Sequence, residues 1–202
     1  MGTHRIAAFA AALVTTVGLA PAVAAPACRA LLSDPSHDTT LEGLVPVDEP
    51  GADLLAVDLG ATRKKLRIVT TIRDVDAPLT TSPLGRGVLT RITVGGTTFD
   101  VSVTHAKDGT SGRVSVHGEP VGGEWLGHAS FETDAARNQL RVELPFAMLE
   151  PYAGHLGNGT RVTVASALTH DVKGTTKTTY LWSGIDQTTG TAMWTIGSRS
   201  CV

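Results

Sequence analysis

The sequence predicts an all-β protein, an antiparallel β-sandwich of the jelly-roll or immunoglobulin-like kind with about ten strands. Apolar and polar residues alternate with a period of two along much of the chain, while helical spacing is almost absent beyond the first residues. Clusters rich in glycine, asparagine and aspartate separate these short runs. Neither a repeat nor a linker divides the 202 residues, so one domain is expected.

The chain begins with a segment typical of a secretory signal peptide. Arg5 precedes an uncharged apolar stretch, residues 6–20, and small residues follow it up to Ala27. That stretch is shorter than the roughly 20 residues that a membrane-spanning helix needs, and no later segment is apolar enough to replace it. We therefore expect a signal peptide at 1–25, a single β-sandwich domain at 26–202, and a protein that is secreted and extracellular, with no membrane span.

The only two cysteines, Cys28 and Cys201, lie near the two ends of the predicted mature chain. Outside the cytoplasm an even number of cysteines favours a disulfide, which here would join the start of the domain to its end. The alternative is a lipid on Cys28. The preceding Ala-Pro-Ala lacks the larger aliphatic residue of a lipoprotein signal, and lipidation would leave Cys201 without a partner. The disulfide is therefore the favoured prediction.

The first predicted strands occupy residues 54–59 and the stretch RKKLRIVTTIRDV. In that stretch Leu66, Ile68 and Ile72 fall on one face and Arg67 and Arg73 on the other, as expected of a strand with one buried side. Residues 35–52, which precede these strands, are polar and contain three prolines. They are expected to be the least regular part of the domain.

The segment GVLTRITVGGTTFDVSVTH predicts a hairpin, because Gly95-Gly96 suits a two-residue type I′ turn between β-rich arms. Folding on this turn pairs Arg91 with Asp100 on one face. The other face becomes apolar, and its members are Val88, Thr90, Ile92, Phe99, Val101 and Val103. A slip of one residue would destroy both patterns, so the register is well specified.

The rest of the chain predicts six further short strands and one helical turn. The strands are expected at 113–117, 128–133, 139–144, 161–170, 176–182 and 192–196. Turn-forming clusters separate them at 107–109, 134–138, 157–159 and 184–190. The stretch PFAMLEPYAG, which follows Leu144, is expected to form the helical turn.

Four stretches carry a resemblance to known proteins: DPSHD, DLLAVDLGATRKKLRIVTTIRDVDAP, VELPFAML and YLWSGIDQTTGTAMWTIG. Their order resembles that of secreted bacterial β-sandwich domains similar to DOMON domains and family-nine carbohydrate-binding modules. The resemblance covers most of residues 34–197. It implies a ligand-binding or adhesive sandwich that acts outside the cell and in some members binds sugar.

The charge balance argues against two classes of partner. A net charge of −2 provides neither the basic surface of a nucleic-acid-binding protein nor a polybasic membrane patch. Aspartates are instead concentrated early in the domain, and oxygen-rich loops at the end of a sandwich suit calcium. Asp34, Asp38, Asp74 and Asp76 are the candidate ligands of a structural calcium ion. The alternative, which the sequence favours, is that these aspartates cap turns.

Three aromatic residues are candidates for ligand binding. Tyr180 and Trp182 are two residues apart in a predicted strand and therefore share a face, and Trp125 lies among glycines in a predicted loop. Exposed aromatic rings could stack on sugar rings. Core packing is the favoured alternative for Tyr180 and Trp182, because aromatic residues make up only 4% of the chain.

No catalytic residues are predicted. Ser36-His37-Asp38 contains the letters of a triad, but neighbouring residues in an extended chain point apart. The sequence therefore favours a secreted, non-enzymatic ligand-binding module whose partner is an extracellular glycan or an envelope component. A structural or envelope-interaction protein without a small-molecule site is one alternative. An extracellular hydrolase is the other.

Overall fold

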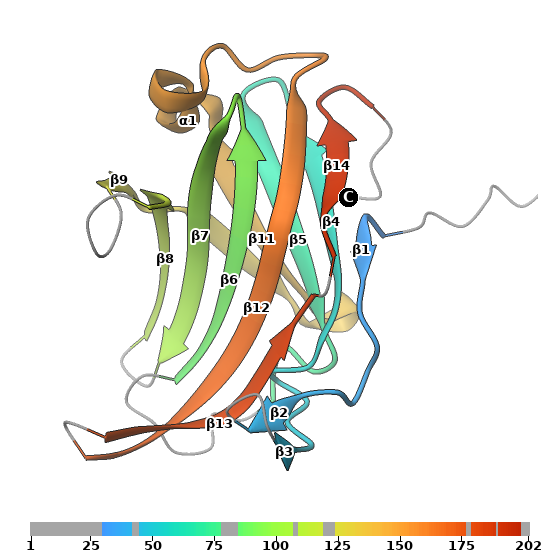
Figure 1. Cartoon of the computed structure of the whole chain (residues 1–202), viewed down its shortest axis with the longest axis vertical. Coiled ribbons are helices and arrows are strands. Elements are labelled where there is room, and N and C mark those ends of the chain that lie inside the picture. The colour runs from blue at the N-terminus through green and yellow to red at the C-terminus, as the bar shows by residue number, and fades with distance from the viewer. Residues whose placement is uncertain are drawn as a thin grey trace, which may run out of the picture.

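The computed structural model describes residues 30–41, 45–77, 85–106, 109–118, 124–176, 179–188 and 190–198. It confirms the predicted all-β sandwich, built from two antiparallel sheets (Figure 1). The predicted signal peptide and both cysteines of the predicted disulfide lie outside the described residues. Within the described ranges no helix is long and apolar enough to cross a membrane.

The first sheet has five strands in the order β1-β4-β5-β11-β10. Their bounds are Leu32–Ser33 (β1), Leu54–Ala61 (β4), Lys65–Ile72 (β5), Gln139–Pro145 (β11) and Ser130–Asp134 (β10). The expected strand in RKKLRIVTTIRDV is β5, and Leu66, Ile68 and Ile72 are buried as its alternation predicts. They therefore form part of the inner face of the sheet.

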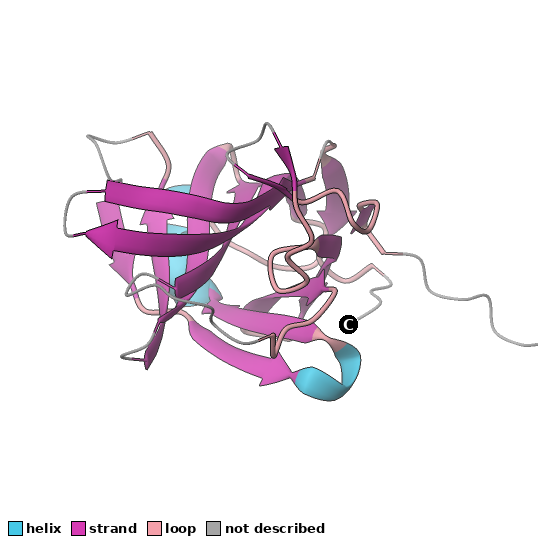
Figure 2. Cartoon of the chain, turned by 90° about the horizontal axis from the view of Figure 1, so that it is seen from below, coloured by secondary structure: helices cyan, strands magenta, loops and turns pink. Residues whose placement is uncertain are grey.

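The second sheet has nine strands, of which eight follow the order β3-β2-β13-β12-β6-β7-β8-β9 and the ninth, β14, pairs with β12. Their bounds are Thr40–Leu41 (β2), Val45–Pro46 (β3), Gly85–Val94 (β6), Thr97–Ala106 (β7), Gly109–Val116 (β8), Glu124–Gly127 (β9), Arg161–Thr176 (β12), Thr179–Gln187 (β13) and Ala192–Thr195 (β14). Figure 2 looks along the sandwich from the end that carries β2, β3 and β13.

The hairpin of β6 and β7 confirms the predicted register residue by residue. Ile92 is opposite Phe99, and Arg91 is opposite Asp100. The predicted apolar face is buried, and the Arg91 Nε donates to Asp100 Oδ1 at 2.8 Å. Gly95 has a φ of 57°, and a Cβ at this position would lie 1.9 Å from the Ala153 carbonyl oxygen, so glycine is required there.

The number and extent of the strands differ from the prediction. Fourteen strands lie in the described part of the chain instead of about ten, because three of them have only two residues and β9 forms around Trp125, where a loop was expected. The hairpin of β12 and β13 also runs further, with Leu168 opposite Gln187 and Thr176 opposite Thr179. The expected helical turn is present as α1, Phe146–Ala153.

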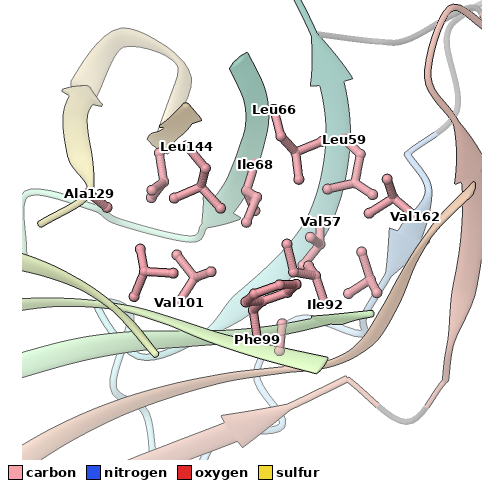
Figure 3. Packing of buried hydrophobic residues seen from close by; sticks show 14 of the residues in the cluster. Val57, Leu59, Leu66, Ile68, Ile92, Phe99, Val101, Ala129, Leu144 and Val162 are labelled. Carbon is pink, nitrogen blue, oxygen red and sulfur yellow. The ribbon is translucent and has the colours of Figure 1, made fainter. Parts of the chain in front are cut away.

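The core lies between the two sheets, where aliphatic side chains from both sides meet (Figure 3). Val57, Leu59 and Ile68 come from the five-stranded sheet, and Ile92 and Phe99 from the other. All five are almost fully buried. The core thus fixes the two sheets face to face. Both features described next lie toward the end of the sandwich that carries β2, β3 and β13.

Candidate metal centre and inter-sheet cavity

An irregular segment joins β1 to β2 and carries two of the aspartates that the sequence singles out. It runs from β1, beside β4, down to β2, beside β13 (Figure 1). The Asp34 N–H donates to the Leu55 carbonyl at 2.9 Å, and the His37 N–H donates to Asp53 Oδ2 at 2.8 Å. These bonds hold the segment against the start of β4.

A third aspartate, Asp186, reaches this segment from β13. Both oxygens of its side chain accept hydrogen bonds from backbone N–H groups. The Leu54 N–H donates to Asp186 Oδ2 at 2.6 Å, and the Gln187 N–H donates to Oδ1 at 2.7 Å. Asp186 is only 5% exposed. Since Ile185 pairs with Thr40 of β2, the chain approaches the Asp34–Thr39 segment at this point.

Asp34, Asp38 and Asp186 form a group in which one carboxylate oxygen from each residue lies within 4.8 Å of the other two. Burial and the neighbouring Asp38 raise the pKa of Asp34 to about 6. Burial, followed by the charges of Asp38 and Asp34, raises the pKa of Asp186 to about 7. Like charges in a poorly solvated place disfavour ionisation, which explains both directions.

Asp53 contacts the Asp34–Thr39 segment through the His37 N–H and has no exposed surface. Its Oδ2 accepts from the His37 N–H and is 3.1 Å from Arg73 Nε, while its Oδ1 has no hydrogen-bond partner among the described residues. Asp34 Oδ2 is a second buried oxygen without a partner there. The charge of Asp53 also contributes to the raised pKa of Asp34. Buried carboxylate oxygens are normally paired, so these two need an explanation.

The structure separates the four predicted calcium ligands into two pairs. Asp34 and Asp38 belong to the group, whereas Asp74 and Asp76 lie on the turn after β5 and are not members of it. There the Asp76 N–H donates to Asp74 Oδ1 at 3.2 Å, which is turn capping. Sequence analysis missed Asp186, although it is the only charged residue between Lys177 and Arg199.

A cavity of about 580 Å³ opens between the sheets at the same end of the sandwich. Its lining combines polar side chains with four buried aliphatic residues, Ile72, Val88, Val103 and Leu140. The polar residues of the lining are Asp76, Arg86, His105, Thr110 and Thr133. The Arg86 Nη1 donates to the Ala77 carbonyl at 2.9 Å, and His105 Nδ1 is 2.5 Å from Thr110 Oγ1. This is the usual composition of a small-molecule site.

The three predicted aromatic ligand-binding residues lie on two different strands, β9 and β13. Trp125 on β9 is 57% exposed. Its ring packs edge to face against that of His128, with 5.3 Å between the ring centroids. Tyr180 and Trp182 belong to β13, where they pair with Gly174 and Val172, but their side chains lie outside the described residues. Trp194 on β14 is buried in the core.

The fold and these sites define an all-β sandwich with a carboxylate cluster and a cavity at one end. No protein-family model, no curated protein and no solved structure matches the chain. The resemblance to DOMON domains and family-nine carbohydrate-binding modules therefore stays a prediction.

Proposed function

We propose that the protein is a secreted, non-enzymatic ligand-binding module that holds a small organic molecule in the inter-sheet cavity. The observation that carries this proposal is the cavity itself, with its volume of about 580 Å³ and its buried aliphatic lining residues. Ligand sites typically occupy roughly 300–1,000 Å³ and combine apolar walls with a few polar groups. The polar groups here lie on β6, β7, β8 and β10, and in the turn after β5.

The lining favours a ligand with an apolar body and one hydrogen-bonding end. Val88 and Val103, which are opposite each other in the β6–β7 hairpin, are buried, whereas His105 and Thr110 are exposed at the ends of β7 and β8. No phenylalanine, tyrosine or tryptophan is among the lining residues that the structure describes. A sugar ring would therefore lack the stacking partner that aromatic side chains provide in many carbohydrate sites.

The cavity can be tested by blocking it with a bulky side chain. The Thr110→Trp variant places an indole at the exposed edge, and Ser111→Trp is the matched control, because Ser111 is the next residue of the same strand and is also exposed. The probe is 1-anilinonaphthalene-8-sulfonate, followed by its displacement with medium-chain fatty acids and neutral oligosaccharides. We expect T110W to weaken probe binding at least tenfold and S111W to preserve it.

Two results would contradict a cavity ligand. One is a folded wild-type protein that binds neither the probe nor any member of the panel. The other is equal binding by T110W and S111W, which would place the probe elsewhere on the surface. Thermal unfolding of both variants should show that each is folded.

A glycan bound at the surface is the second candidate, and the exposure of Trp125 favours it. Aromatic rings exposed to this degree can stack against the apolar faces of sugars. Trp125→Ala should then abolish the fluorescence response to an oligosaccharide panel, while T110W preserves it. The reverse pattern would support the cavity instead.

A further inference from the structure

We propose that Asp34, Asp38 and Asp186 bind a calcium ion that joins the N-terminal segment of the domain to β13. This inference does not depend on the proposed function, since none of the three residues lines the inter-sheet cavity. The ligand set also differs from the one that the sequence predicts, because Asp186 replaces Asp74 and Asp76.

The spacing of the carboxylates suits a common ion. One oxygen from each carboxylate lies within 4.8 Å of the other two. Calcium binds oxygen at about 2.3–2.6 Å, so two ligands on opposite sides of the ion are about 4.6–5.2 Å apart. All three carboxylates can therefore reach one ion without rearrangement of the backbone. Calcium takes six to eight oxygens, and backbone carbonyls and water commonly complete its shell.

An independent observation points to a missing ligand at this place. Asp53 has no exposed surface, and its carboxylate contacts the Asp34–Thr39 segment, where the His37 N–H donates to its Oδ2. Its Oδ1 has no hydrogen-bond partner in the described part of the chain, and neither has the buried Asp34 Oδ2. Two buried acceptor oxygens without donors are costly unless something outside the chain satisfies them.

The chemistry of the group selects the kind of cation. All ligand atoms are carboxylate oxygens, without the histidine or cysteine that zinc prefers. Arg73 lies 3.1 Å from Asp53, but no described Lys, Arg or His forms an ion pair with Asp34, Asp38 or Asp186. Three carboxylates without a basic partner give a hard divalent cation both its charge complement and its oxygen ligands.

A bound ion would connect parts of the chain that are distant in sequence. Asp34 and Asp38 belong to the first residues of the domain, whereas Asp186 is in β13 and also accepts from the Leu54 N–H at the start of β4. An ion that binds only the folded arrangement stabilises it by mass action. The expected consequence is a calcium-dependent thermal stability.

The test is thermal unfolding of the purified protein after removal of divalent ions with EGTA, repeated with calcium chloride. We expect the Tm to rise by about 5–10 °C when free calcium exceeds the Kd a hundredfold. Isothermal titration calorimetry with calcium chloride should show one site. Asp34→Asn and Asp38→Asn should each lose at least half of the Tm shift, and D38N should stay folded because Asp38 is exposed.

The matched control is Asp74→Asn, which makes the same chemical change but keeps an oxygen to accept from the Asp76 N–H. D74N should retain the whole calcium-induced rise in Tm. A wild-type protein whose Tm is unchanged by millimolar calcium would overturn the proposal, as would a full shift in both D34N and D38N. Loss of calcium binding leaves the probe test of the cavity unaffected, so the two proposals fail separately.

Discussion

Two groups of carboxylates on this sandwich have opposite environments. On the five-stranded sheet, Glu143 lies 2.6 Å from Lys65 Nζ and 2.8 Å from Arg67 Nη2. Hydrogen bonds from Lys65 and then Arg67 lower the pKa of Glu143. At the end of the sandwich, burial and neighbouring carboxylates raise the pKa values of Asp34 and Asp186.

The two groups differ in whether basic side chains compensate the charge of the carboxylates. In the first group the strands β5 and β11 provide the compensating charge themselves, because Lys65, Arg67 and Glu143 meet in the register of the sheet. In the second group the described residues provide backbone N–H donors, and the nearby base Arg73 pairs with Asp53 and not with Asp34, Asp38 or Asp186. The second group is therefore the one that gains from an added cation.

The largest expected effect of a substitution is at Asp186. Asp186→Ala removes the acceptors of the buried Leu54 N–H and the part-buried Gln187 N–H, and a buried donor without a partner costs about 1–3 kcal/mol of unfolding free energy. Urea unfolding measures this loss. Asp186→Asn keeps one acceptor oxygen and should lose less, so an equal loss in both variants would show that the charge, not the hydrogen bonding, matters most.

Substitution of Asp34 is expected to change the Tm less, and the direction of the change should depend on whether calcium is present. In EGTA, Asp34→Asn removes the repulsion of Asp34 by Asp38 and Asp53, together with its charge effect on Asp186, and should raise the Tm by a few degrees. In calcium the same variant should be less stable than the wild type, because it lacks a ligand. Thermal unfolding in EGTA and in calcium checks whether the order of the two Tm values, D34N and wild type, reverses. A variant that is less stable under both would contradict the repulsion.

The pH dependence should also differ between the two groups. The raised pKa values mean that the folded, metal-free protein binds protons more tightly than the unfolded chain, so Asp34 and Asp186 lower its stability as the pH rises from about 4 to about 7. The lowered pKa of Glu143 acts oppositely, since its contribution is present above the ordinary value of 4.5 and is lost as the pH falls.

Urea unfolding at several pH values in EGTA checks these signs. The wild type should lose stability relative to D34N between about pH 4 and pH 7. Relative to Glu143→Gln it should lose stability only toward lower pH. A difference between wild type and D34N that does not change with pH would contradict the raised pKa.

The smallest effect is expected from Glu143→Gln at neutral pH. Ion pairs that solvent reaches contribute about 0–1 kcal/mol, and the side chains of Lys65 and Arg67 are 45% and 34% exposed. Urea unfolding should therefore give nearly the wild-type midpoint, and the calcium-induced Tm shift should be unchanged. A loss comparable to that of D186A would remove the contrast between the two groups.

Much of the fold could be predicted because its signals are local. The β6–β7 hairpin follows from Gly95-Gly96 and from the alternation on either side, which fix every pair from Val94–Thr97 to Val88–Val103. The two-residue strands β1, β2 and β3 could not be predicted, because so short a run contains no period. They exist only because β4 and β13 offer partners.

The candidate metal centre, too, could be predicted only in part from the sequence. The sequence by itself determined the class of the fold, the register of its central hairpin and the candidacy of Asp34 and Asp38. Only the tertiary structure decided that Asp186, far along the chain, joins them while Asp74 and Asp76 cap a turn. The physical reason is that strand alternation and turns depend on neighbours in sequence, whereas a ligand set depends on which distant segments the packed sheets bring together.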